Sequence, residues 1–146
     1  MKKAVRAIIF KDNNLLVIKR NKFGKEYYTL PGGGVDLGET TDQALAREMH
    51  EETGLALGMA RPVFIEQARE PYGVQYIYLV DYVSGEPKLD PSSDEAVIGA
   101  AGKNTYEPMW LPTAKLAEVP FVSARLQKTL LHCIVHGFPT AITEVV

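Results

Sequence analysis

The residues best suited to chemistry lie at positions 33–55, which read GGVDLGETTDQALAREMHEETGL. Glu48, Glu51 and Glu52 follow the i, i+3, i+4 spacing that gathers side chains on one face of a helix. Like charges at this spacing destabilise an isolated helix, and Arg47 alone cannot neutralise all of them. A hard divalent cation can, because Mg²⁺ or Mn²⁺ takes carboxylate oxygens and keeps waters for a phosphate substrate. The pattern therefore predicts a metal site that acts on phosphates.

A glycine turn precedes the carboxylates and must place a ligand beside them. The run Pro31-Gly32-Gly33-Gly34 lets the backbone bend sharply and approach a ligand without side chains in the way. Gly33 and Gly34 are therefore candidate substrate contacts. The strand expected just before this turn, residues 27–30, carries Tyr28, a further candidate that could border a substrate base or pack in the strand.

The helix that carries the carboxylates is expected at about residues 42–53. Thr40 or Thr41 supplies its N-terminal cap, and Asp42 lies in the first turn, where the helix dipole stabilises a negative charge. Gly54 tolerates the left-handed geometry that ends a helix. The apolar positions that would face the rest of the fold are Ala44, Leu45, Met49 and the trailing Leu55.

These residues together resemble a known motif. Gly33, five residues, Glu39, seven residues and then REMHEETGL at 47–55 resemble the complete Nudix box, with every fixed position filled. The resemblance implies an α/β fold, a Nudix-like α/β/α sandwich with a mixed β-sheet, formed by one domain over residues 1–146. The competing interpretation is a Glu-rich helix whose charged face is simply exposed to solvent. The glycines and Arg47 at the spacing of the motif argue against it.

Roles for individual residues follow from this resemblance. Glu48, Glu51 and Glu52 would bind the divalent metal, joined by the backbone carbonyl of Gly32. Glu39 would hold a more distant, supporting position. Arg47 would orient a glutamate through bidentate hydrogen bonds rather than touch substrate. We expect Glu52, Glu48 and Arg47 to be needed for catalysis.

Nudix enzymes also draw a general base or a further metal ligand from a loop beyond the box. Asp94, Glu95 and Glu107 are the candidates here, with preference for Glu95. Residues 84–104 form a long polar segment, which we interpret as a mobile loop over the substrate rather than a linker.

The remaining elements are expected on either side of the box. Residues 5–10 and 15–19 should form a hairpin, followed by a polar loop at 21–26. Residues 62–70 and 74–83 should form a second hairpin around Pro71-Tyr72-Gly73, and 106–111 a returning strand. A short helix at 113–118 and a final helix at 123–136, stopped by Gly137, complete the chain. His132 and His136 could suggest zinc, but the sequence has no second ligand pair.

Length, net charge and cysteine content limit the classes of function that are possible. The 146 residues suit one globular domain, and the net charge of −2 gives no basic footprint for duplex nucleic acid. The single cysteine, Cys133, fits a reducing compartment, and no stretch approaches membrane-spanning length. We therefore expect a cytoplasmic protein without a membrane partner. The sequence is compatible with a homodimer and does not require one.

The expected activity is Mg²⁺- or Mn²⁺-dependent hydrolysis of a diphosphate linkage in a nucleoside diphosphate joined to another moiety. A nucleoside triphosphate, an ADP-ribose-like compound and a dinucleoside polyphosphate all remain open, because Pro71 and Tyr72 fit the sub-signatures of two substrate classes equally. The alternative is a non-catalytic, nucleotide-binding regulatory Nudix domain, which should have lost box carboxylates. A Nudix-fold isomerase of prenyl diphosphates would need a cysteine ahead of the box, and the sequence has none there.

Overall fold

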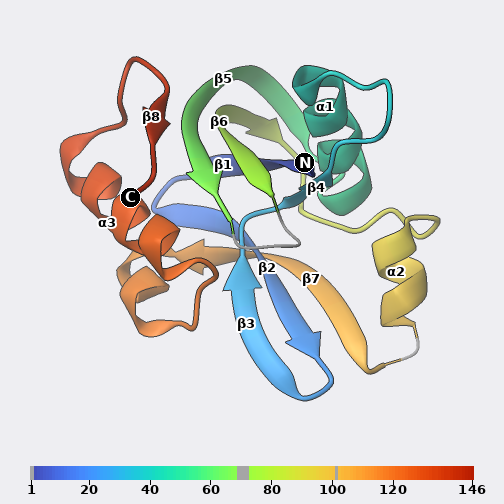
Figure 1. The fold of residues 1–146 in the computed structure, drawn as a ribbon. Helices are drawn as coiled ribbons and strands as arrows, with labels where there is room; N and C mark the ends of the chain where they lie inside the picture. The colour runs from blue at the N-terminus through green and yellow to red at the C-terminus, as the bar shows by residue number, and fades with distance from the viewer. Residues whose placement is uncertain (1, 69–72, 101) are drawn as a thin grey trace.

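The computed structural model describes residues 2–68, 73–100 and 102–146. Figure 1 shows the elements as a sheet with helices on both sides of it. The elements are, in chain order, β1 Lys3–Lys11, β2 Asn14–Lys22, β3 Lys25–Thr29, β4 Gly32–Gly34, α1 Thr41–Glu52, β5 Ala56–Gln67, β6 Val74–Ser84, α2 Asp94–Gly99, β7 Asn104–Pro112, the 3-10 helix η1 Thr113–Glu118, α3 Ala124–His136 and β8 Thr143–Glu144.

Across the described residues the strands form one 8-stranded mixed sheet with the order β3-β2-β1-β6-β5-β8. Strands β1 and β6 run parallel, whereas β1 and β2 are antiparallel. Strand β4 pairs with β1, and β7 pairs with β2, beside this main path. The mixed sheet with packed helices confirms the predicted α/β sandwich.

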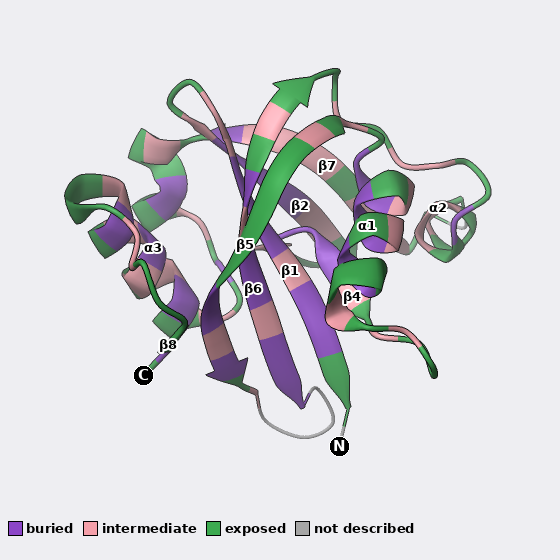
Figure 2. Ribbon diagram, turned by 90° about the horizontal axis from the view of Figure 1, so that it is seen from above, coloured by how far each residue is buried: buried purple, intermediate pink, exposed green. Residues whose placement is uncertain are grey.

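The central strands are buried on both faces, and their side chains alternate between two cores. Val5, Ala7 and Ile9 of β1 face the core that α1 covers, whereas Ile8 faces the core on the other side. Figure 2 shows the resulting buried stripes along β1, β2 and β6. Because both faces are covered, these strands read as continuous apolar runs rather than as an alternating pattern.

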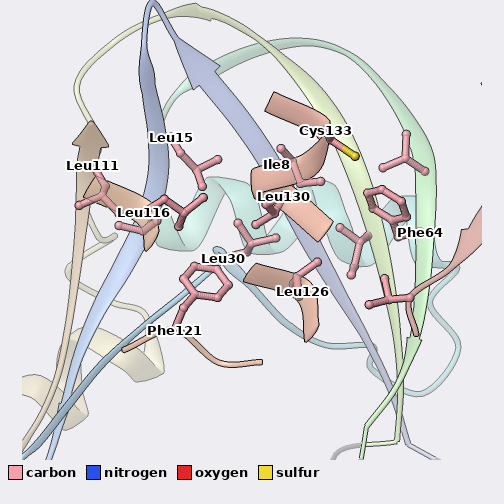
Figure 3. Close-up of a cluster of buried hydrophobic side chains, with 14 residues drawn as sticks. Ile8, Leu15, Leu30, Phe64, Leu111, Leu116, Phe121, Leu126, Leu130 and Cys133 are labelled. Atoms are coloured by element: carbon pink, nitrogen blue, oxygen red, sulfur yellow. The ribbon is translucent and has the colours of Figure 1, made fainter. Parts of the chain in front are cut away.

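Helix α3 closes the second core. Ser123 caps it by accepting a hydrogen bond from the Leu126 backbone, and Gly137 follows its last turn. Leu126 and Leu130 lie with Ile8 and Leu30 in this core (Figure 3). The predicted inward positions Leu126, Leu130 and Cys133 are buried, and Ile134 packs at their edge.

Both predicted hairpins are present. Phe10 pairs with Leu15 across the first turn, and β5 pairs with β6 in antiparallel register. The returning strand is β7, and the predicted helix at 113–118 is η1. The hairpin residues Pro71 and Tyr72 lie outside the described residues.

The structure differs from two predicted loops, although the predicted mobility of residues 84–104 stays a prediction. Residues 21–26 do not form an open loop, because β2 extends to Lys22 and β3 begins at Lys25, so the two strands continue pairing almost to the turn. The segment 84–104 contains helix α2, which Ser93 caps through its side chain. Because α2 has only 6 residues and the segment around it is polar, the sequence shows no helical periodicity there.

Candidate active site

The glycine turn, β4, lies directly against β1 and the first carboxylate of the box. Val5 pairs with Gly33, and Arg6 pairs with Gly32. A Cβ atom on Gly32 would lie 1.9 Å from the Val5 carbonyl oxygen, and one on Gly33 would lie 2.5 Å from Glu48 Oε1. Gly32 therefore needs to be glycine, because a side chain there would collide with the β1 backbone, whereas a side chain at Gly33 would displace the Glu48 carboxylate.

Helix α1 is fixed at its start by its predicted cap. The Thr40 side chain accepts a hydrogen bond from the Gln43 backbone, and the Gln43 side chain accepts one from the Thr40 backbone, which completes a capping box. The Tyr78 hydroxyl bridges to Thr41 and Asp42 from β6. The predicted inward residues Ala44, Leu45 and Met49 are buried on the sheet. Glu48 and Glu52 consequently face the glycine turn.

Three carboxylates converge at this turn. Glu48, Glu52 and Glu95 each offer an oxygen, and these atoms lie within 4.8 Å of one another. Glu52 Oε1 accepts a hydrogen bond of 2.9 Å from the Gly32 N–H. Glu48 Oε2 and Glu95 Oε2 are buried and have no hydrogen-bond partner. Buried carboxylate oxygens without donors are costly, and a divalent cation would satisfy both.

Burial changes the titration of this cluster. Burial raises the pKa of Glu52 to about 8, against the opposing effects of the Gly32 hydrogen bond and the Arg6 charge. Burial also raises the pKa of Glu48, although the hydrogen bond from Arg47 acts in the opposite direction. Proteins commonly place carboxyl groups with shifted pKa values at functional sites, and a cation would reverse both shifts.

Arg47 connects the supporting residues of the box. Its Nε and Nη2 donate to the two oxygens of Glu39 at 2.8 and 2.9 Å, and its Nη1 donates to Glu48 Oε1 at 2.9 Å. Nη2 also donates to the Gly34 carbonyl oxygen. The Arg47 hydrogen bonds, with one from the Asp36 N–H, lower the pKa of Glu39 to about 2. Arg47 thus orients the Glu48 carboxylate through a hydrogen bond to Oε1.

Helix α2 supplies the carboxylate from outside the box. It packs beside β7, and the chain leading into it is tied to the end of α1, where the Asp90 N–H donates to the Glu51 carbonyl oxygen. Of the three sequence candidates, Glu95 enters the cluster. Asp94 and Glu107 are exposed and lie outside it.

Glu51 does not join the cluster in this structure. Its side chain is about 30% exposed, and its Oε2 lies 3.5 Å from Arg47 Nη1. Glu48 and Glu52, one helical turn apart, point to the glycine turn, whereas Glu51 points away from it toward Arg47. The helical spacing alone grouped all three, and only the turn determines which of them meet.

A cleft of about 1070 Å³ opens beside the cluster. Gly32, Gly33, Glu52 and Glu95 line it at the cluster. The side chains that line it farther away include those of Arg6, Ile18, Arg20, Lys22, Lys25, Tyr27, Glu66, Gln75, Ile77, Tyr106, Arg125 and Leu126. A mixture of cations and apolar walls beside carboxylates suits a phosphorylated ligand with an apolar part.

Two predicted substrate contacts are displaced from this cleft. Tyr28 packs against the core that α3 covers, and its neighbour Tyr27 lines the cleft instead. Gly34 is not among the lining residues, and its carbonyl oxygen accepts from Arg47. The ring centroids of Tyr27 and Tyr106 lie 5.5 and 3.7 Å from the guanidinium carbon of Arg20.

Sequence reasoning missed most of the cleft wall, including Arg6, Glu66 and Gln75. The one signal for Glu66 was a charge directly after the apolar run Val63-Phe64-Ile65, since a buried strand rarely carries a carboxylate. In the part of the chain that the structure describes, no helix is long and apolar enough to cross a membrane.

Comparison with known proteins gives consistent results. A family model described as "NUDIX domain" matches residues 1–130. An ADP-ribose pyrophosphatase of Methanocaldococcus jannaschii is 40% identical over 98 residues, which cover 64% of this chain and 58% of that protein. The NAD-capped RNA hydrolase NudC of Edwardsiella ictaluri is 30% identical over 112 residues, covering 77% of this chain and 39% of that protein. This chain therefore spans less than two thirds of either relative.

Among solved structures, the MutT NUDIX hydrolase from Burkholderia pseudomallei superposes with a TM-score of 0.65 at 26% identity. The match covers 90% of this chain and 95% of that one. The box, the mixed sheet and the family match agree, and the chain belongs to the NUDIX domain family.

Proposed function

We propose that this protein hydrolyses the diphosphate linkage of a nucleoside diphosphate joined to another moiety, with Mg²⁺ or Mn²⁺ as cofactor. The observation that carries the proposal is the buried cluster of Glu48, Glu52 and Glu95, in which two carboxylate oxygens lack any donor. It lies at the glycine turn in a cleft large enough for a nucleotide.

The chain's own residues would divide the work as follows. Glu48, Glu52 and Glu95 would hold the cation, and Gly32 and Gly33 would let the diphosphate approach it. Glu51 would join them only by leaving its ion pair with Arg47. A bound divalent cation would draw charge from the phosphate oxygens as a Lewis acid.

Glu95 is the proposed proton acceptor for the attacking water. Its Oε2 is buried and has no hydrogen-bond partner, and Glu95 comes from a different element than the box. Arg47 would keep Glu48 oriented without touching substrate, since its donors already bind Glu39, Glu48 and the Gly34 carbonyl.

The substrate class rests on the relatives. One is named an ADP-ribose pyrophosphatase and another a NAD-capped RNA hydrolase, which favours a diphosphate that links a nucleoside to a second group. A nucleoside triphosphate and a dinucleoside polyphosphate stay within the proposal. The single cysteine favours a reducing compartment such as the cytoplasm.

The test is a panel of these substrates with Mg²⁺ or Mn²⁺, read by release of nucleoside monophosphate, with and without excess chelator. We expect release from at least one substrate, loss of release in chelator, and recovery when the cation returns. A folded protein that binds nucleotides and releases no product under any condition would instead support the non-catalytic, regulatory alternative.

A further inference from the structure

The part of the cleft away from the metal cluster contains a buried polar floor formed by adjacent strands. Glu66 of β5 pairs with Gln75 of β6, so their side chains lie side by side. Both line the cleft, and their exposed fractions are only 4% and 9%. Arg6 of β1 donates its Nε–H to Gln75 Oε1 at 3.0 Å. The floor is therefore a fixed arrangement and not a set of mobile surface side chains.

One oxygen of Glu66 is already bound. Its Oε2 accepts a hydrogen bond of 2.5 Å from the Ser123 hydroxyl and lies 3.5 Å from Arg125 Nη2. Across the described residues, each hydrogen bond and ion pair of Glu66 goes to Oε2. Oε1 is thus left as an acceptor at the wall of the cleft. A carboxylate in an ion pair with Arg125 offers only acceptor atoms to a ligand.

The wall of the cleft also includes apolar residues. Ile18, Ile77 and Leu126 line the same cleft. Arg6 connects this region to the metal cluster, because its charge also acts on Glu52. A ligand whose diphosphate lies at the cluster could therefore place a flat apolar group between these walls, with its polar edge at Glu66. A nucleobase has this shape, whereas a sugar has hydroxyls on all sides.

We propose that Glu66 selects substrates whose base presents an exocyclic amino group, as in cytosine and adenine, over bases with a carbonyl there, as in uracil and hypoxanthine. An amino N–H can donate to Oε1, whereas a carbonyl oxygen would face the carboxylate lone pairs. Sites built on one hydrogen-bonding pattern discriminate strongly against a ligand that leaves a buried group unpaired. This inference rests on the proposed function, because it assumes that the cleft binds a nucleotide.

The first test measures binding without turnover. Calorimetric titration in chelator compares CMP with UMP and AMP with IMP, two pairs that differ at the amino or carbonyl position. We expect the amino member of each pair to bind about tenfold tighter or more. Equal affinities within both pairs, or no binding of any of these nucleotides, would overturn the proposal.

The second test changes the acceptor. Glu66→Gln keeps the size and an oxygen for Ser123, but its amide can turn an N–H₂ group toward a carbonyl. We expect the preference within each pair to fall toward parity, with UMP and IMP gaining affinity. Glu118→Gln, an exposed glutamate on η1, is the matched control and should retain the wild-type preference. An unchanged preference in Glu66→Gln would assign the selectivity elsewhere.

A sugar at this floor is a distinct outcome. The test compares two losses of affinity relative to wild-type protein with CMP: the loss when the wild type binds 2′,3′-dideoxy-CMP, and the loss when Glu66→Gln binds CMP. If the two losses were equal, Glu66 would bind the ribose hydroxyls, and the proposal would be wrong. Hydrolysis separates this inference from the proposed function. Turnover of CTP and UTP at equal rates would contradict the inference alone, whereas selective CMP binding by a protein that hydrolyses nothing would contradict the proposed function alone.

Discussion

At the scale of single residues, the site depends on close approach. Gly33 has room for Glu48 only because it lacks a Cβ, whereas a Cβ on its neighbour Gly34 would meet nothing within 4 Å. The two glycines look equivalent in the sequence, and the structure gives them different tolerances. This difference provides a matched pair of variants.

We predict that Gly33→Ala lowers turnover on the order of a hundredfold, because the new methyl must push the Glu48 carboxylate out of the cluster. Gly34→Ala should stay within a few-fold of wild type. The measurement is kcat on the best substrate of the panel, with circular dichroism to verify folding. Equal losses in both variants would show that the turn acts through its backbone and not through room for Glu48.

The pKa of Glu52 predicts how stability depends on pH. In the metal-free protein Glu52 has a pKa of about 8, above its ordinary 4.5, so the native state binds more protons than the unfolded state between these values. Stability should therefore fall as pH rises from about 5 to 8. The low pKa of Glu39 acts in a separate window, with stability lost as pH falls from about 4.5 toward 2.

Thermal unfolding in chelator at a series of pH values measures this effect. The wild-type Tm should decline from pH 5 to pH 8, and saturating Mg²⁺ should reduce the decline, because the cation replaces the proton. Glu52→Gln should give a flatter profile in chelator. Superimposable profiles for the two proteins would show that Glu52 titrates normally in the folded state.

At the scale of elements, α1 and α2 contribute differently to the site. Helix α1 is capped, packed on the sheet and held by Tyr78. Helix α2 has 6 residues, none of them buried, and carries Glu95. Elements with few buried contacts open most easily, so α2 is the part of the site whose order should respond to the cation.

Hydrogen exchange tests this difference. Exchange of the backbone amides at 96–100 should slow when Mn²⁺ is added, because a cation shared by Glu95 and the α1 glutamates ties the helices together. Glu95→Gln should show little slowing, and α3 should exchange equally with and without Mn²⁺. If α2 slowed to the same extent in Glu95→Gln, its order would not depend on this carboxylate.

At the scale of the whole molecule, local features could be predicted and long-range pairings could not. The caps of α1, its buried stripe and the glycine turn follow from spacings within residues 33–55. Which of Tyr27 and Tyr28 faces the cleft depends on the register of β3 against β2, where a shift of one residue exchanges the two sides. Glu95 is the preferred candidate because of its place in the long segment, but no periodicity in the sequence encodes the packing of α2 on β7 that accompanies its place in the cluster.

The central claim is that Glu48, Glu52 and Glu95 form a divalent cation site, and a Mn²⁺ titration monitored by electron paramagnetic resonance tests it most directly. The wild-type protein should bind Mn²⁺, and Glu52→Gln and Glu95→Gln should each weaken the affinity about tenfold or more. Glu107→Gln, an exposed control on β7, should bind as the wild type does. Wild-type affinity in both cluster variants, with all proteins folded, would contradict the account.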